Sequence, residues 1–200
     1  GPQPLCQSNC PLGVNAQGYI ALTRVGKFQE ALDLVRRDNI LPGICGRVCT
    51  HPCEDECRRG DLDGPISIRN IKRFLADYEL SNNREPQVPL IQPREEKIAV
   101  IGSGPGGLAA AADLARLGYQ VTVFEKEAKA WGLLRYGIGA YRLPREILDS
   151  ELKYIERLGV KFETSHPVAL SQDMKEIQGG FRAVILTTGA WVDRKLGVPG

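Results

Sequence analysis

Long apolar runs and an imbalance of charge are both missing from this 200-residue sequence. No stretch approaches the ~20 apolar residues of a membrane-spanning helix, and the first residues show no signal-peptide pattern. The formal net charge is only +2, which gives no argument for binding nucleic acid or an anionic membrane. Internal repeats and low-complexity segments are absent too. We therefore expect a cytoplasmic globular protein that binds neither membrane nor nucleic acid.

Cysteine is missing beyond residue 57, although six cysteines precede that point. This uneven distribution predicts a cysteine-containing domain over residues 1–81 and a second domain over residues 97–200. Residues 82–96 carry three prolines without periodicity and are expected to form an extended linker. The chain starts with Gly-Pro instead of Met and stops at Leu-Gly-Val-Pro-Gly. We therefore expect a fragment whose second domain is truncated.

Hydrophobic periodicity predicts that the first domain is helical. Helices are expected at residues 19–25, with Asn15 as a candidate N-cap, and at residues 28–35. A third, amphipathic helix is expected from Ile68 to about Ser81. The first 80 residues should therefore form helices around the cysteines.

Strands and helices alternate in the second domain. The expected strands are 98–101, 121–124, 160–162 and 183–187, and the expected helices are 108–117 and 145–158. The short apolar runs are typical of buried parallel strands. The predicted fold class is α/β, with an all-α N-terminal domain followed by part of a doubly wound, Rossmann-type sheet.

The first strand of the second domain leads into a G-x-G-x-x-G motif, residues 102–107. Gly102 allows a tight turn, Gly104 lets the backbone approach a pyrophosphate, and Gly107 lets helix and strand pack closely. The N-terminus of the following helix attracts phosphate. Glu125 ends the second strand, where an acid can bind ribose hydroxyls. The pattern predicts a dinucleotide site, and the alternative is a glycine-rich turn that binds nothing.

The six cysteines predict a metal site. They are Cys6, Cys10, Cys45, Cys49, Cys53 and Cys57, the last four at every fourth position. A disulfide framework is one alternative, but the dinucleotide-type domain behind them favours reduced thiols and hence metal. The spacing favours an iron–sulfur cluster over zinc, with buried inert thiols as a third alternative. His51 is either a further ligand or a surface or cap residue.

Four arginines crowd the cysteines. They are Arg47, Arg58, Arg59 and Arg69. They form either a solvated charged face or a set of cations that offsets the negative charge of a thiolate-bound cluster and raises its potential.

The chain resembles a known family over essentially its whole length. CPLGVNAQGYI, CGRVCTHPCEDECRRG and GPISIRNIKRFLADYE resemble the N-terminal iron–sulfur domain of the glutamate synthase small subunit and of dihydropyrimidine dehydrogenase. The FAD domain that follows in both is similar to KIAVIGSGPGGLAAAADLARLGYQVTVFEK, GLLRYGI, YRLPREILDSELKYIERLGVKF and VILTTGA. The resemblance implies an electron-transfer module that contains FAD and [4Fe-4S] clusters.

The resemblance also implies site residues. The FAD pyrophosphate would lie on Gly102, Ser103, Gly104, Pro105 and Gly106, with Gly107 completing the motif and Glu125 on the ribose. The adenosine and flavin would be lined by Lys126, Gly132 and Leu133, with Arg142 at the flavin and Val168 at the adenine. One cluster would be shared by Cys10, Cys49 and Cys53, and another would take Cys6 and Cys57.

Several positions depart from the family pattern, among them Ile138-Gly139, where the family has Ile-Pro. Family members with two clusters carry a further C-x2-C upstream of the position of Cys6, which this chain starts too late to show. Those members also have Gln or Glu where this chain has Lys72, a poor ligand that Cys45 could replace. One complete cluster is therefore expected rather than two. Trp131 puts a large side chain where the family backbone passes close to FAD, so it is expected either to stack on the cofactor or to obstruct it.

The sequence contains one dinucleotide fingerprint and no acid–base or nucleophile constellation, in keeping with chemistry done by cofactors. By resemblance, the expected function is electron transfer from NAD(P)H via FAD to [4Fe-4S] clusters and on to a partner subunit or domain. NAD(P)H would bind through a domain absent from this chain. The alternative is a non-catalytic iron–sulfur relay or docking subunit with a structural Rossmann unit.

We expect the fragment alone to be inactive, to bind FAD weakly or not at all, and to favour a homodimer through an exposed sheet face.

Overall fold

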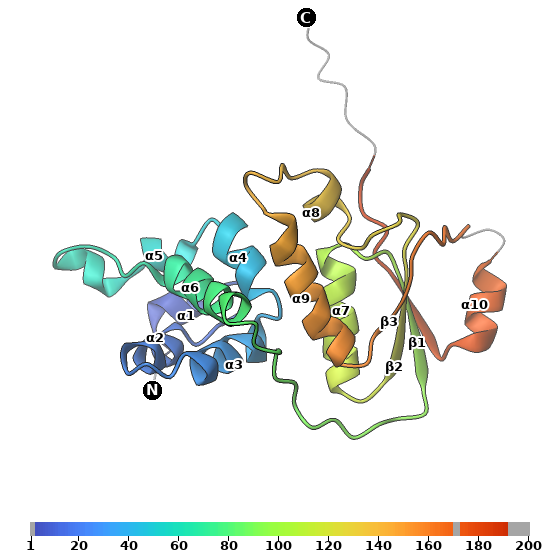
Figure 1. Cartoon of the computed structure of the whole chain (residues 1–200), viewed down its shortest axis with the longest axis horizontal. Coiled ribbons are helices and arrows are strands. Elements are labelled where there is room, and N and C mark those ends of the chain that lie inside the picture. Colours follow the sequence, from blue (N-terminus) through green and yellow to red (C-terminus); the bar gives the residue numbers. More distant parts are fainter. Residues whose placement is uncertain (1–2, 170–172, 192–200) are drawn as a thin grey trace, which may run out of the picture. The chain divides into compact units, whose positions relative to one another are not determined.

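The computed structural model describes residues 3–169 and 173–191 (Figure 1). Their contacts divide the chain into two compact units. Unit 1 comprises residues 1–88 and 140–154, and unit 2 comprises residues 89–139 and 155–200. Among the described residues, no helix is both long enough and apolar enough to cross a membrane.

Unit 1 is helical, as its hydrophobic periodicity predicted. It contains α1 (Leu5–Ser8), α2 (Ala16–Arg24), α3 (Phe28–Asp38), α4 (Pro42–Val48), α5 (Pro52–Asp55), the 3₁₀ helix η1 (Arg58–Asp61) and α6 (Ile68–Ser81) (Figure 1). The three predicted helices are confirmed as α2, α3 and α6. Helices α4 and α5 were not predicted, and each starts with a proline, which suits the first helical position because it has no N–H to leave unpaired.

The core of unit 1 lies among α2, α3 and α6. Tyr19, Leu32, Val35 and Leu75 are almost fully buried there. The hydroxyl of Tyr19 donates a hydrogen bond of 3.0 Å to the carbonyl oxygen of Ile68, so burying this polar group leaves it satisfied. Asn15 caps α2 as predicted: its side chain accepts a 2.9 Å hydrogen bond from the N–H of Gly18.

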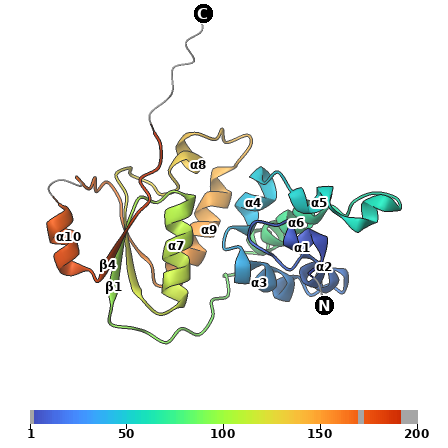
Figure 2. The same cartoon turned by 180° about the vertical axis from the view of Figure 1, so that it is seen from behind.

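Unit 2 contains one parallel sheet. Its strands are β1 (Lys97–Ile101), β2 (Gln120–Phe124), β3 (Lys161–Glu163) and β4 (Ala183–Leu186), in the order β3-β2-β1-β4. Helix α7 (Pro105–Arg116) lies on one face of the sheet and α10 (Met174–Gly180) on the other (Figures 1 and 2). This arrangement confirms the predicted α/β fold class with a partial Rossmann-type sheet.

The register of the strands brings their carboxyl ends together. Ile101 at the end of β1 pairs with Phe124 at the end of β2, and with Leu186 at the end of β4. The N–H of Gly102 continues the ladder by donating to the carbonyl oxygen of Phe124 at 2.8 Å. The glycine-rich turn and Glu125 therefore meet at one edge of the sheet.

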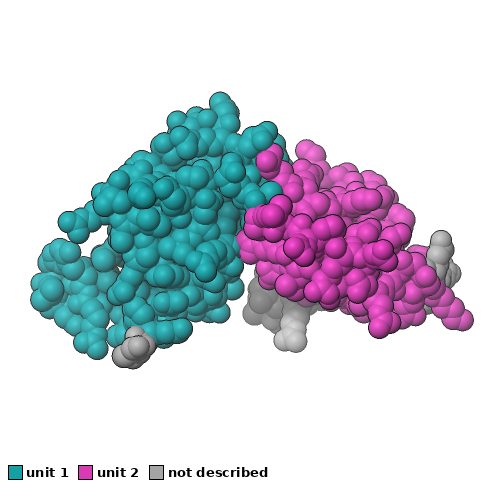
Figure 3. Space-filling view, turned by 90° about the horizontal axis from the view of Figure 1, so that it is seen from below, with its two compact units in different colours: residues 1–88, 140–154 teal, residues 89–139, 155–200 magenta. Residues whose placement is uncertain are grey.

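Residues 140–154 belong to unit 1, shown in teal in Figure 3, although the boundary predicted from the sequence put them in the second domain. They include most of α9 (Arg145–Arg157). The carboxylate of Glu151 accepts a 2.7 Å hydrogen bond from the N–H of Gly43, in the first turn of α4. The ring of Tyr154 lies 4.7 Å from the guanidinium of Arg36 on α3. These buried polar contacts explain the grouping, which hydrophobic periodicity does not reveal.

Candidate functional site

The turn after β1 is shaped by two glycines that leave no room for a side chain. Gly102 adopts a φ of 104°, and a Cβ atom there would lie 2.4 Å from the carbonyl oxygen of Thr187. At Gly107, a Cβ atom would lie 2.1 Å from the carbonyl oxygen of Gly102 and 2.5 Å from Thr187 Oγ1. These contacts give Gly102 and Gly107 the turn and packing roles that the motif predicts.

Gly104 and Gly106 are different, because nothing lies within 4 Å of the place where their Cβ atoms would be. Gly104 is the N-cap of α7, and no side chain caps that helix end. The first turn of a helix carries N–H groups without intrahelical partners and a partial positive charge. The open space in front of these glycines therefore favours an anionic group such as a pyrophosphate.

Glu125 is buried directly after β2, with only 4% of its surface exposed. Its Oε2 accepts hydrogen bonds from both the backbone N–H (3.0 Å) and the hydroxyl of Ser103. Its Oε1 accepts a 2.8 Å hydrogen bond from the N–H of Glu127. The carboxylate thus ties the glycine-rich turn to the end of the neighbouring strand. The sequence predicted an acid here but not its bond to Ser103, because that position of the motif accepts any residue.

A pocket of about 560 Å³ opens at this edge of the sheet. Its walls come from the ends of β1, β2 and β4, from the glycine-rich turn, and from the segments that follow β2 and β3. Open α/β sheets bind their ligands at the carboxyl ends of their strands. The volume lies within the range of roughly 300–1,000 Å³ that is usual for small-molecule sites.

Most of the residues predicted for cofactor binding lie in the pocket wall. These are Gly102, Ser103, Gly104, Pro105, Gly106, Glu125, Lys126, Gly132, Leu133 and Val168. Gly107 packs behind the turn instead. Arg142 is an exposed residue of unit 1, and its role at the flavin stays a prediction.

Several wall residues were not predicted. They are Ile101, Phe124, Leu134, Ile138, His166, Pro167, Thr187 and Trp191. The strand ends among them could have been inferred from the sheet topology, whereas the residues after β3 and β4 follow no sequence motif.

One side of the pocket combines a cation with an aromatic ring. The Nζ atom of Lys126 lies 4.4 Å from the ring centroid of Trp191, a cation–π contact. The ring of Tyr136, which ends helix α8 (Leu133–Tyr136), lies 6.1 Å from the same indole. Tyr136 is not part of the pocket wall, so this side offers one aromatic ring, that of Trp191, and the positive charge of Lys126 to a nucleotide.

Trp131 lies outside the pocket. Its indole is fully buried, and the residue is not part of the pocket wall. The backbone adopts a φ of 98°, with its N–H donating to the carbonyl oxygen of Ser103 at 3.1 Å. In this structure the ring therefore does not obstruct the pocket. The following Gly132 approaches the turn so closely that a Cβ atom would lie 3.3 Å from the Cα atom of Gly104.

The six cysteines are all partly buried, and none is in a disulfide. Cys6 lies on α1, Cys10 between α1 and α2, Cys45 on α4, Cys49 directly after α4, Cys53 on α5 and Cys57 at the N-cap position of η1. Cys6, Cys10 and Cys53 pack against the apolar core around Tyr19. Two sulfurs accept backbone hydrogen bonds: Cys49 Sγ from His51 N–H at 3.3 Å, and Cys57 Sγ from Ile66 N–H at 3.5 Å.

Burial disfavours the thiolate form of several of these groups. It raises the pKa of Cys6 and Cys45, and it raises the pKa of Cys53 to about 11. The positive charge of Lys72 acts in the opposite direction on Cys45 and Cys53. Thiols with raised pKa values stay protonated at neutral pH until a coordinated metal removes the proton.

The thiols suit an iron–sulfur cluster chemically. Within residues 3–169 and 173–191, no three His, Cys, Asp or Glu side chains are grouped so that they could hold a metal ion. The thiolates of a four-iron cluster bind different iron atoms and so stand farther apart than the ligands of one ion. Soft thiol donors, an apolar flank and N–H groups directed at sulfur are the environment such clusters use. The donor set fits the group.

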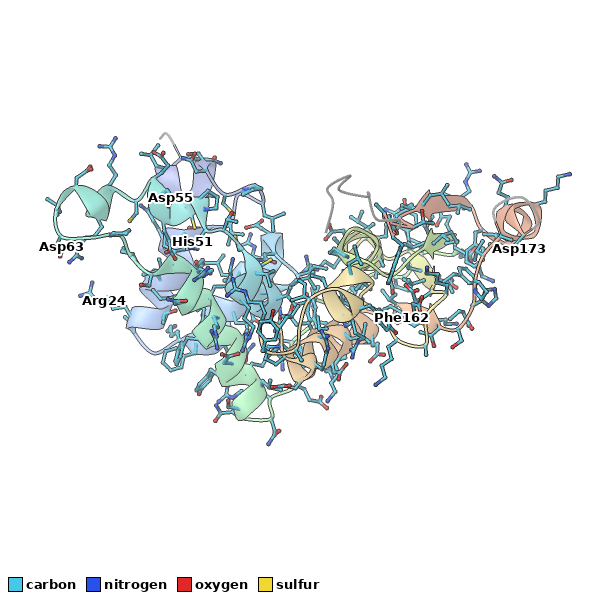
Figure 4. All side chains as sticks on the ribbon, turned by 90° about the horizontal axis from the view of Figure 1, so that it is seen from above. Arg24, His51, Asp55, Asp63, Phe162 and Asp173 are labelled. Carbon is cyan, nitrogen blue, oxygen red and sulfur yellow. The ribbon has the colours of Figure 1, made fainter. Side chains whose placement is uncertain are left out.

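The charged neighbours of the cysteines have specific partners. Arg47 donates to the carbonyl oxygen of Gly43 at 3.1 Å and to Asp77 at 2.6 Å. Arg59 pairs instead with the exposed Asp63, which is labelled in Figure 4. His51 occupies the N-cap position of α5, with a φ of 54°. Arg69 donates from Nη1 to the carbonyl oxygen of Cys49 at 3.1 Å. The four arginines therefore do not act as one group: Arg69 contacts the cysteine loop directly, and Arg59 does not.

The parallel sheet, the glycine-rich turn and the pocket define a dinucleotide-binding α/β protein. Residues 96–200 match the family described as "Pyridine nucleotide-disulphide oxidoreductase", and the chain belongs to this family. Residues 2–84 match a domain described as "Dihydropyrimidine dehydrogenase domain II, 4Fe-4S cluster". The chain thus joins a 4Fe-4S domain to an FAD-binding oxidoreductase domain, which confirms the resemblance seen in the sequence.

Curated relatives match nearly the whole chain. The NADP(+)-dependent formate dehydrogenase subunit beta of Moorella thermoacetica is 39% identical, over 98% of this chain and 31% of its own length. The NADPH-Fe(3+) oxidoreductase subunit beta of Geobacter sulfurreducens is 36% identical, over 98% and 29%. The glutamate synthase [NADPH] small chain of Mycobacterium tuberculosis is 34% identical, over 98% and 40%. The chain therefore spans less than half the length of these relatives.

Proposed function

We propose that this chain is the FAD- and cluster-binding part of an NAD(P)H-dependent oxidoreductase subunit. FAD binds in the pocket of unit 2, and a [4Fe-4S] cluster binds to the thiols of unit 1. NAD(P)H, held by a further domain, donates a hydride, and a partner subunit or domain receives the electrons one at a time. Bound FAD supplies the conversion of a two-electron donor into single electrons.

The observation that carries this proposal is the pocket in front of Gly104 and Gly106. A bound pyrophosphate needs open space at the N-terminus of α7, whereas a Rossmann unit with only a structural role does not. The pocket wall adds Lys126 for a phosphate or ribose and Val168 for an apolar ring. The residues of this chain would thus bind and orient the dinucleotide.

Two further observations support the other parts of the proposal. The six reduced thiols of unit 1 match in chemistry what an iron–sulfur cluster needs. A partner subunit is supported by the names of the relatives, which are called subunit beta or small chain.

The test uses the intact subunit to which this chain belongs, purified without oxygen. NADPH or NADH should bleach the flavin absorbance, and an added one-electron acceptor should then be reduced. Cys49→Ser should leave flavin bleaching intact and abolish reduction of the acceptor, because electrons then stop at the flavin. Lys129→Ala, an exposed change outside both sites, serves as the control.

The outcomes separate the proposal from its rival. A subunit that contains iron and sulfide but binds no FAD would be a relay or docking protein. A subunit whose bound FAD is not reduced by either nicotinamide would contradict the proposed hydride donor.

A further inference from the structure

Lys72 occupies an unusual place for a lysine. It lies in the middle of α6 and is 9% exposed. Its neighbours on the helix define the face it lies on: Arg69 contacts the Cys49 carbonyl, and Arg73 packs against Gly46, where a Cβ atom would lie 2.8 Å from the Arg73 Cα atom. Residues three and four apart share one helix face. Lys72 is therefore directed toward α4 and α5, the helices that carry Cys45 and Cys53.

The ammonium group has no acidic partner within the described ranges, and its positive charge lowers the pKa of the Cys45 and Cys53 thiols, against the larger effect of burial. Glu151 and Glu54, whose charges act on Cys45 and Cys53, already accept other hydrogen bonds. Glu54 accepts from the N–H of Arg69 at 2.7 Å, and Glu151 accepts from the N–H of Gly43 at 2.7 Å. Thiolates bound to a cluster would place negative charge beside this ammonium, and opposite charges that lie close together stabilise each other.

The thiols near Lys72 form a connected series. The N–H of Cys49 donates to the carbonyl oxygen of Cys45 at 3.2 Å, and Arg69 joins the Cys49 carbonyl to Glu54 on α5, the helix that carries Cys53. Cys53 and Cys10 pack against the same apolar core. Four thiolates bound to an iron–sulfur cluster carry a net negative charge, which is the partner that the ammonium lacks. The protonated amine itself has three donors and no lone pair, so it cannot ligate iron.

We propose that Lys72 is the counter-charge of a [4Fe-4S] cluster bound by Cys10, Cys45, Cys49 and Cys53. This inference rests on the proposed function, because it requires a bound cluster. The buried positive charge stabilises the more negative, reduced state and so raises the reduction potential. Lys72 is a positioning residue, since it acts through the cluster without binding iron.

The test is a redox titration of the anaerobically purified chain, followed by electron paramagnetic resonance. Lys72→Met keeps the length of the side chain and removes its charge. We expect the ratio of reduced to oxidised cluster at a fixed potential to fall about tenfold, which corresponds to about 59 mV for a one-electron couple. Lys72→Arg should keep the wild-type ratio. Arg73→Met, on the same helix but with its exposed cation paired with Asp77, is the matched control and should change little.

Each possible result either supports or overturns the proposed role of Lys72. A cluster of unchanged potential in Lys72→Met would overturn the inference and leave the proposed function standing. Wild-type protein without iron and sulfide would overturn both. If Lys72→Met fails to load a cluster while Lys72→Arg loads normally, the charge is required for loading and the inference stands. If both variants fail to load, shape and not charge is what matters, and the inference falls.

Discussion

The two candidate sites of this chain are built from different parts of the polypeptide. In unit 2 the pocket is formed mainly by backbone: two glycines that tolerate no side chain, two more that leave open space, and one helix N-terminus. In unit 1 the site consists of side chains, the six thiols, carried on short helices and loops. The pocket is already shaped in the protein alone, whereas burial raises the pKa of Cys6, Cys45 and Cys53, which need a metal to become thiolates at neutral pH.

The interiors of the two units also differ, because one is apolar and the other contains buried charges. The sheet of unit 2 has an apolar centre, with Ala99, Val100 and Val123 fully buried. Unit 1 buries charges as well: Arg36 and Glu79 form two hydrogen bonds of 2.7 and 2.6 Å, and Glu151 is buried close by. A backbone site on an apolar scaffold is expected to depend on single glycines, while a side-chain site among buried charges is expected to depend on pH and on metal.

The largest effect is expected for Gly107→Ala, which breaks the backbone site. The new Cβ atom would collide with the carbonyl oxygen of Gly102 at 2.1 Å, and backbone cannot move away cheaply. We expect a loss of about 3 kcal/mol or more in the free energy of unfolding, measured by urea denaturation. Gly106→Ala is the control, because its Cβ atom meets open space. Equal stability of the two variants would contradict the close packing of α7.

A smaller effect is expected for Glu125→Ala, which removes the acid that joins the turn to β2. Three donors, from Ser103 and Glu127, would lose their acceptor, at roughly 1–3 kcal/mol for each that stays buried. We expect FAD affinity to fall at least about tenfold, equivalent to ~1.4 kcal/mol, in an FAD titration of the intact subunit. Glu163→Ala changes an exposed acid at the end of the neighbouring strand and should have no effect. Unchanged FAD affinity with weakened NADPH binding would assign the pocket to the nicotinamide cofactor instead.

The smallest effect concerns the buried charges of unit 1. Burial raises the pKa of Glu151 to about 8, despite the opposing charge of Arg36. The ordinary pKa of this carboxyl group is 4.5. Between pH 4.5 and about pH 8, Glu151 therefore loses its proton in the unfolded chain and keeps it in the folded chain. Stability should therefore fall as pH rises through this window, by up to ~1.4 kcal/mol per pH unit.

Glu151→Gln keeps the acceptor for Gly43 N–H and removes the titration. In urea denaturation at pH 6 and pH 8, the variant should lose about 1–2 kcal/mol less between the two values than the wild type does. Glu146→Gln, exposed on the same helix, is the control. A wild type whose stability rises over this range would show that Glu151 is ionised in the folded chain.

The backbone site was largely predictable from sequence, because glycines at fixed spacing between strand and helix have few structural uses. Gly102 and Gly107 have the predicted turn and packing roles, and Gly104 and Gly106 face open space as a pyrophosphate site requires. The bond between Ser103 and Glu125 was not predictable, since it depends on the register that brings the ends of β1 and β2 together. The same holds for Trp191, which follows no motif and reaches Lys126 only through the fold.

The side-chain site was predictable in kind but not in arrangement. Cysteine spacing indicated a metal site, but no periodicity indicated the short helices α4 and α5, each of which starts with a proline. The resemblance put Lys72 at a ligand position, but the periodicity of the helix did not indicate that Lys72 is buried, because a lysine on an amphipathic helix is usually exposed. The grouping of residues 140–154 with unit 1 depends on Glu151 and Tyr154, whose polar contacts are long-range.

The proposed function is tested most directly by analysing iron, acid-labile sulfide, zinc and FAD in the intact subunit, purified without oxygen. It predicts iron and sulfide in equal amounts, at least about four of each per subunit, together with bound FAD. Cys49→Ser should lower iron and sulfide and leave FAD in place, because the two sites are built independently. Stoichiometric zinc without sulfide, or a subunit that binds no FAD, would contradict it.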